Sequence, residues 1–175
     1  MWKRLTQAFL SANGLFLAGC FDRTETIPVE KLDLQTVLAS PLSDATGQAV
    51  SKDAFKGKYV GFYFSASWCP PCRAFTPDLL AFRNAHSDAF EVVLVGADRS
   101  AAEQAQYMHK YEMPWPALAF GSKKSSELSE ALGIRGIPAM VVVGPDGTVL
   151  STKGREEVQS LGARALEEWK KRQKP

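Results

Sequence analysis

The chain has 175 residues, of which 45% are hydrophobic and 23% are charged, and its formal net charge is +2. This length suits one domain with short appendages, and the hydrophobic content is sufficient for a buried core. A charge balance so close to neutral gives the protein no field that would attract nucleic acid. We therefore expect one folded domain that does not bind DNA or RNA.

The first residues of the chain have the pattern of a bacterial export signal. Met1-Trp2-Lys3-Arg4 is basic, and residues 5–17 are moderately apolar. Leu17-Ala18-Gly19-Cys20 is similar to a lipobox, in which the cysteine becomes the lipidated first residue of the mature protein. The apolar stretch is too short and too polar for a membrane-spanning helix, which needs about 20 residues. The alternative is an amphipathic extension with a chance cysteine.

The lipobox interpretation divides the chain into three parts. Residues 1–19 are a lipoprotein signal peptide, residues 20–30 are a polar tether, and residues 31–175 are the folded domain. Removal of the signal takes away two basic residues and no acid, so the mature chain is formally neutral. We expect a lipid anchor at Cys20 and a location in the bacterial cell envelope, facing the periplasm or the cell exterior. The alternative location is the cytoplasm.

Short elements open the domain. Residues 32–38 and 49–50 are expected to be short strands on either side of a turn at Asp44-Ala45-Thr46-Gly47. Ser51 is a suitable N-cap for a short helix that ends at Gly57. These features predict an N-terminal strand or hairpin extension.

Two cysteines lie between the next strand and the next helix, in Trp68-Cys69-Pro70-Pro71-Cys72. Residues 58–64 are an apolar, aromatic run typical of a buried strand, and residues 73–82 have apolar side chains at helical spacing. A cysteine at a helix start meets unpaired backbone N–H groups, which favour the thiolate over the thiol. We therefore predict Cys69 as the nucleophile and Cys72, one turn further on, as the resolving thiol.

Zinc binding and an inert structural disulfide are the other uses of such a pair. Zinc takes about four ligands, usually from a second Cys-x-x-Cys or from two histidines. The chain has one further cysteine, Cys20, and its two histidines, His86 and His109, have no short metal-ligand spacing with it. An inert disulfide would need neither Trp68 nor the two prolines. The strand–Cys-x-x-Cys–helix order favours redox activity, and we predict neither a metal nor an organic cofactor.

The rest of the chain continues an α/β pattern. The expected elements are a strand at residues 90–96, a helix from Ser100 to about Tyr111 with a capping box of Ser100 and Glu103, a short helix from Ser126 to Leu132, a hairpin of residues 139–143 and 148–151, and a last helix with apolar residues from Val158 to Trp169. A standard crossover would make the two central strands parallel.

Four motifs, in order, resemble the tryparedoxin and nucleoredoxin branch of the thioredoxin superfamily. They are residues 64–77 around the cysteines, Asp98-Arg99-Ser100, Met113-Pro114-Trp115, and Gly136-Ile137-Pro138 with the hairpin that follows. The resemblance runs from about Leu32 to Val158. It implies the α/β thioredoxin fold, with a central mixed β-sheet of about four strands flanked by helices.

The resemblance also implies where a substrate binds. Pro138 is expected to follow a cis peptide bond beside the cysteine pair and to leave the sheet edge open to a substrate backbone. The residues expected to contact substrate are Trp68, Pro70, Pro71, Ile137 and Pro138.

One departure from the family concerns proton transfer. Many thioredoxins carry a buried acid six residues before the first active-site cysteine, and Tyr63 stands at that position here. The sequence therefore identifies no proton acceptor for Cys72 other than water. Tyr107, Tyr111 and Trp115 either line a groove or belong to the core, and neither histidine is expected to be catalytic.

These observations together predict a membrane-tethered thiol–disulfide oxidoreductase that cycles Cys69 and Cys72 between dithiol and disulfide. The expected direction is disulfide reduction, with disulfide-containing proteins or peroxidases as substrates and another donor, such as a membrane disulfide reductase, as the source of electrons. A monomer is expected. The alternatives are a thiol oxidase or isomerase of the same fold and a non-catalytic binding or chaperone module.

Overall fold

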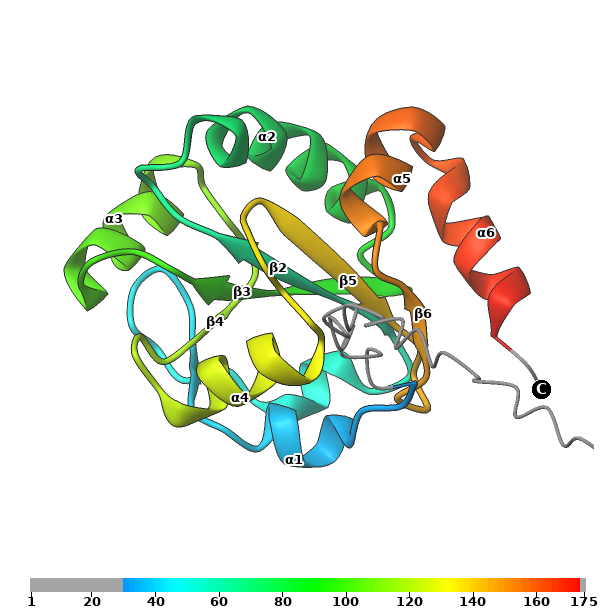
Figure 1. Ribbon diagram of the computed structural model, residues 1–175, viewed down its shortest axis with the longest axis horizontal. Helices are drawn as coiled ribbons and strands as arrows, with labels where there is room; N and C mark the ends of the chain where they lie inside the picture. The colour runs from blue at the N-terminus through cyan, green and yellow to red at the C-terminus, as the bar shows by residue number, and fades with distance from the viewer. Residues whose placement is uncertain (1–29, 174–175) are drawn as a thin grey trace, which may run out of the picture.

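The computed structural model describes residues 30–173, in which a six-stranded mixed sheet lies between two layers of helices (Figure 1). The strand order is β1-β4-β3-β2-β5-β6, with β1 Leu42–Ser43, β2 Tyr59–Ser65, β3 Phe90–Gly96, β4 Ala117–Leu118, β5 Ala139–Val143 and β6 Val149–Ser151. The central strands β2 and β3 are parallel, as expected, and β5 pairs with β2 in the antiparallel sense. This arrangement is the fold that the resemblance implies, with two more strands than expected.

Alternating side chains of the strands supply two separate cores, because successive residues of a strand point to opposite faces of the sheet. Tyr63, Val92 and Leu94 point to one face, and Phe62 and Phe64 point to the other. The first face is covered by α2 Pro70–Ala85, α3 Ala101–Lys110, α5 Gly154–Leu161 and α6 Arg164–Arg172. The second is covered by α1 Leu34–Leu38, the 3₁₀ turn Lys52–Phe55 and α4 Lys123–Ala131.

Three helix starts are fixed by the side chains that the sequence indicated. Ser51 accepts a hydrogen bond from the backbone N–H of Asp53, and Ser100 accepts one from Glu103. The Glu103 carboxylate in turn accepts the N–H of Arg99, so two otherwise unpaired donors are satisfied at the start of α3. At the start of α2 the capping group is the sulfur of Cys69, which places the redox pair at that helix end.

The expected strand at residues 32–38 is wrong, because this segment contains helix α1. The carboxylate of Asp33 accepts the backbone N–H of Thr36 and caps the helix, while Leu34, Val37 and Leu38 turn toward the second core. Their spacing fits one face of a helix, whereas Leu32, Leu34 and Leu38 also fit the two-residue period of a strand. The rest of the N-terminal extension is a hairpin, since Ser43 of β1 bridges Ala49 across the expected turn.

Two further helix boundaries differ from the expectation. Helix α4 begins at Lys123 instead of Ser126, because Ser122 accepts the backbone N–H of Ser125 and is the N-cap. The expected last helix is two helices, α5 and α6, separated at Gly162. Gly162 has a φ of +55°, a conformation that residues with a side chain rarely adopt, and the chain turns there.

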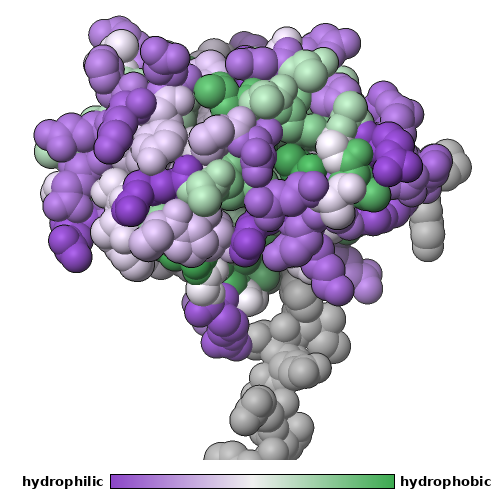
Figure 2. All heavy atoms as spheres, turned by 90° about the horizontal axis from the view of Figure 1, so that it is seen from above, coloured by the Kyte–Doolittle hydropathy of each residue, from purple (hydrophilic) through white to green (hydrophobic). Residues whose placement is uncertain are grey.

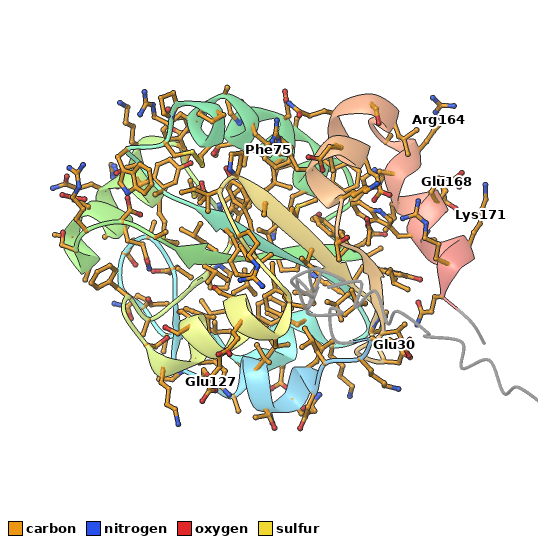
Figure 3. All side chains as sticks on the ribbon, in the orientation of Figure 1. Glu30, Phe75, Glu127, Arg164, Glu168 and Lys171 are labelled. Atoms are coloured by element: carbon orange, nitrogen blue, oxygen red, sulfur yellow. A yellow bond between two sulfur atoms is a disulfide. The ribbon has the colours of Figure 1, made fainter. Side chains whose placement is uncertain are left out.

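Charged side chains cover the outer surface. On α6 the labelled side chains of Arg164, Glu168 and Lys171 extend away from the sheet, and Phe75 points from α2 toward it (Figure 3). The face that carries α2, α5 and α6 shows apolar patches surrounded by polar residues (Figure 2).

No helix within residues 30–173 has the length and apolar character needed to cross a bilayer. The expected signal peptide, Cys20 and nearly all of the tether lie outside the residues that the structure describes.

Candidate active site

The redox pair is a disulfide between Cys69 and Cys72, whose Cα atoms are 5.2 Å apart. Cys69 is the N-cap of α2, and its Sγ accepts the backbone N–H of Cys72 at 3.3 Å. Pro70 and Pro71 are the first two helical residues, where a missing N–H costs no hydrogen bond. Cys69 is 4% exposed and Cys72 is completely buried. The helix start therefore favours negative charge on the sulfur that is also the more accessible of the two.

The turn before the pair is held in place by three hydrogen bonds. The backbone N–H of Ser67 donates to the Asp98 carboxylate at 2.8 Å, and the Ser67 carbonyl accepts from the Arg73 guanidinium at 2.8 Å. The indole N–H of Trp68 donates to the carbonyl of Ala97 at 2.9 Å. Trp68 is nevertheless 47% exposed, so its ring lies at the rim of the site, as expected. The loop after β3 thus fixes the backbone that presents Cys69.

Behind the pair lie buried hydroxyl groups, among them that of Tyr63, which stands at the position of the acid expected in many thioredoxins. Tyr63 Oη donates to the carbonyl of Cys72 at 3.0 Å, and Thr76 Oγ1 donates to the same carbonyl at 2.9 Å. Tyr107 Oη joins Thr76 Oγ1 at 2.8 Å and Ser65 Oγ at 3.0 Å. Burial raises the pKa of Tyr63 far above its ordinary value, so this side chain stays a neutral hydrogen-bond donor. The sequence did not indicate Thr76 or Ser65 as part of the site.

The loop before β5 lies against the pair on its other side. The Ile137–Pro138 peptide bond is cis, as the resemblance implied. Ile137 packs against the small cluster of Ala66, Cys69 and Cys72. Pro70 and Pro71 are exposed and Pro138 is half-buried. The structure thus brings the candidate contact residues around the pair, while their part in substrate binding stays a prediction.

The two histidines lie away from the redox pair. His86 caps the far end of α2 and stacks near Phe82, with ring centroids 4.8 Å apart, and His109 is exposed on α3. Trp115 is completely buried in the core, whereas Tyr107, which is 2% exposed, belongs to the core and also lines, together with Tyr111, a hollow between α2 and α3. Within residues 30–173, no group of three or more His, Cys, Asp or Glu side chains is placed to hold a metal ion.

A hollow lies on each flank of the redox pair. One hollow of about 140 Å³, between the start of α2 and α3, is lined partly by the charged side chains of Arg73, Glu103 and Lys110. The other, of about 300 Å³, lies between the ends of β2 and β3, helix α4 and the loop that contains Ile137. None of its lining residues is charged.

Comparison with known proteins agrees with this geometry. The family model described as thioredoxin-like matches residues 57–149. The chain belongs to this family, in its tryparedoxin and nucleoredoxin branch. Tryparedoxin of Trypanosoma brucei brucei is 41% identical over 124 residues, which cover 69% of this chain and 84% of that one. The Cys69–Cys72 pair is therefore that of a thiol–disulfide oxidoreductase.

Two further relatives define the extent of the similarity. Nucleoredoxin of Bos taurus is 40% identical over 126 residues, which are 70% of this chain and only 28% of the nucleoredoxin. The solved structure of tryparedoxin II complexed with glutathionylspermidine is 35% identical, has a TM-score of 0.67 and is covered over 94% of its length, with 75% of this chain. The match extends over most of a tryparedoxin but over less than a third of a nucleoredoxin.

Proposed function

We propose that this protein reduces disulfides through a dithiol–disulfide cycle of Cys69 and Cys72. The Cys69 thiolate attacks one sulfur of the substrate disulfide, that S–S bond breaks, and the first substrate thiolate leaves and takes up a proton. The Cys72 thiolate then attacks the Cys69 sulfur, which closes the Cys69–Cys72 disulfide and releases the second substrate thiolate. Two electrons pass to the substrate, and a thiol donor returns them to the pair.

One observation carries the assignment of roles. Cys69 caps α2 and is the sulfur with some solvent access, whereas Cys72 is completely buried behind it. A substrate disulfide reaches the first sulfur and not the second. The second sulfur is held one helical turn away, within reach of a mixed disulfide on the first.

Reduction of a model disulfide tests the proposal. With a small dithiol as donor, the wild-type domain from Phe21 onward is expected to catalyse the reduction, and Cys69→Ser is expected to abolish catalysis. Full activity in Cys69→Ser would contradict the assignment. Measurement of the reduction potential of the pair decides between a reductase and an oxidase or isomerase, because a strongly oxidising potential would favour the latter two.

The electron donor and substrates belong to the same proposal. The complex of tryparedoxin II with glutathionylspermidine supports a thiol as reaction partner. For the present chain we propose protein disulfides, including those of peroxidases, as substrates. A low-molecular-mass dithiol or a membrane disulfide reductase would supply electrons.

We further propose that a lipid on Cys20 anchors the domain at a bacterial membrane, with residues 21–30 as the tether. The basic start, the apolar stretch and the small residues before Cys20 support this proposal. Several acyl chains would give stable anchoring, because each buried CH₂ contributes about 0.8 kcal/mol. Mass spectrometry of the N-terminal peptide, after expression in a bacterium with a lipoprotein pathway, is expected to show an acylated Cys20. An unmodified segment from Met1 to Cys20 would contradict it.

A further inference from the structure

Helices α2 and α5 lie side by side (Figure 1) and enclose a third hollow, of about 370 Å³, on the half of α2 that is farther from the redox pair. Phe82 and Val158, each 5% exposed, form its floor. Small residues of α2 and of the turn between α5 and α6 line its sides: Ala81, Ala85, Gly162 and Ala163. At these four places nothing larger than a methyl group keeps a second helix away from α2 and α5.

The exposed side of α2 is almost free of charge. Its exposed residues are Pro70, Pro71, Ala74, Pro77, Asp78, Ala81, Asn84 and Ala85, and Asp78 is the charged one among them. Every exposed residue of the neighbouring helix α6 is charged, by contrast: Arg164, Glu167, Lys170, Lys171 and Arg172. Apolar patches interrupt the polar surface on this face of the molecule (Figure 2). An apolar helix face beside a hollow is typical of a surface that another protein covers.

The two ends of the hollow carry complementary polar groups. At one end Nε2 of His86 is buried and has no hydrogen-bond partner within residues 30–173. The His86 ring packs against that of Phe82, with centroids 4.8 Å apart. At the other end the Asp78 carboxylate accepts one bond from Gln159 Nε2, at 3.2 Å, and a carboxylate accepts several. A buried polar atom without a partner is costly, so a carboxylate brought to His86 would stabilise it.

Asp78 and His86 are placed symmetrically on α2. Each is four residues from Phe82, which is about 6 Å along the helix axis, in opposite directions. A two-fold axis that crosses α2 at Phe82 would therefore set Asp78 of each copy opposite His86 of the other. The bond from His86 Nε2 to the carboxylate would then form twice in one interface. The surface is thus complementary to itself.

We propose that two copies of this chain associate through α2 and the hollow, with their α2 helices antiparallel and Asp78 of each copy bonded to His86 of the other. The occupant of the hollow is the uncharged exposed side of the second α2. This weak dimer would replace the monomer expected from the sequence. It leaves both redox pairs open, because Cys69 lies thirteen residues before Phe82, about 20 Å along the helix. The inference does not depend on the proposed function.

Sedimentation equilibrium of the oxidised chain from Phe21 onward, which contains both cores of the fold, tests the association. We expect a monomer–dimer equilibrium with a Kd between about 1 μM and 1 mM, as for weak, transient interfaces. Ala81→Glu puts one charge from each copy beside the two-fold axis and should weaken the dimer at least about tenfold. Ala105→Glu, at an exposed alanine of α3, is the matched control and should leave the Kd unchanged. Both substitutions keep a good helix former.

An exchange of charge tests how the two copies are paired. Asp78→Lys removes the acceptor for His86, and His86→Glu sets two acids opposite each other. We expect each single variant to weaken the dimer at least about tenfold. In the double variant Asp78→Lys/His86→Glu, opposite charges face each other again, so the Kd should return to within about threefold of the wild type.

Two results would overturn the proposed surface: a single monomeric species up to about 1 mM, or a dimer as tight in Ala81→Glu as in Ala105→Glu. A double variant no tighter than the single ones would overturn the pairing of Asp78 with His86. All variants should reduce a model disulfide at the wild-type rate, since the interface is remote from Cys69, and this readout shows that they fold. A wild-type protein that dimerises but reduces no disulfide would contradict the proposed function and leave this inference standing.

Discussion

The two ends of helix α2 are built from different interactions. At its start, three hydrogen bonds fix the backbone around Ser67 and Trp68, and the side chains of Trp68, Pro70 and Pro71 beside Cys69 are exposed. At its other end, Arg83 pairs with Glu91 of β3, and Phe82 packs edge-on against Phe90. At the far end Arg83 and Phe82 find their partners within the described chain, while at the redox end a fixed backbone presents the exposed side chain of Trp68.

The largest expected effect is at the redox end. Cys72→Ser leaves an attacking thiol and removes the one that resolves the mixed disulfide, so turnover should fall by at least about a hundredfold. Mixed disulfides with substrate should accumulate on Cys69, and peptide mapping of the trapped adducts checks this. Adducts found mainly on Cys72 in the Cys69→Ser variant would reverse the two roles.

The far end should affect stability and leave catalysis unchanged. Arg83→Ala leaves the Glu91 carboxylate, which is 5% exposed, with the backbone N–H of Val92 but without a cation, and a buried carboxylate without a cationic partner is costly. We expect the free energy of unfolding in urea to fall by about 2–4 kcal/mol. The matched control is Lys171→Ala, which breaks an exposed ion pair with Glu168 and should cost less than about 0.5 kcal/mol. If Arg83→Ala also slowed the reduction of a model disulfide, this result would contradict the prediction that the far end of α2 affects stability and not catalysis.

The sequence predicts those parts of the fold that are local and long enough to show a pattern. The strand–Cys-x-x-Cys–helix unit is local, and its period, its caps and its two prolines all indicate the same structure. Strands β1 and β4 have two residues each, too few to show a period, so the sheet is wider than expected. Residues 32–38 fit the apolar period of a helix as well as that of a strand. The hydrogen bond from the backbone N–H of Thr36 to the Asp33 carboxylate caps the helix that forms there.

The candidate site likewise has one part that lies in sequence motifs and another part that only the fold brings together. The two cysteines and Pro138 lie in motifs, but the hydroxyls that bond to one another behind the pair come from Tyr63 in β2, Thr76 in α2 and Tyr107 in α3, and only the fold brings them together. The uncharged hollow, of about 300 Å³, depends on small residues from β3, α4 and the loop before β5, and these residues have no common spacing in the sequence. A single sequence shows neither feature, because both arise from contacts between distant segments.

A smaller effect is expected behind the pair. Tyr63→Phe removes one of the two donors to the Cys72 carbonyl and keeps the ring in the core, so unfolding should require about 1 kcal/mol less free energy. Burial raises the pKa of Tyr63 far above its ordinary value, so its hydroxyl stays protonated and is bonded to a carbonyl. The pH profile of disulfide reduction between about pH 6 and 9 should therefore match the wild type. A shifted profile would show that this hydroxyl moves a proton for Cys72.

The smallest expected effect concerns acid stability at the far end, where α5 packs against α2. Burial raises the pKa of Glu157, but hydrogen bonds from Ser151, Trp169 and Arg172 outweigh it and hold the pKa below the ordinary 4.5. The bonds from Trp169 Nε1 and Arg172 are 2.6 and 2.7 Å long. Because the folded-state pKa is lowered, this stabilisation is present above pH 4.5 and is lost as the pH falls through the folded-state pKa.

Glu157→Gln should therefore lower the midpoint of urea unfolding at neutral pH and make it less dependent on pH below about 4.5. Glu130→Gln, on an exposed residue of α4 with no ion pair in the described chain, is the matched control and should follow the wild-type curve. Neither variant should change the rate at which a model disulfide is reduced, because the bonds of Glu157 join α5 to α6 and do not involve Cys69 or Cys72. A Glu157→Gln curve that keeps the wild-type slope in acid would mean that the carboxylate gains nothing from its three donors on folding.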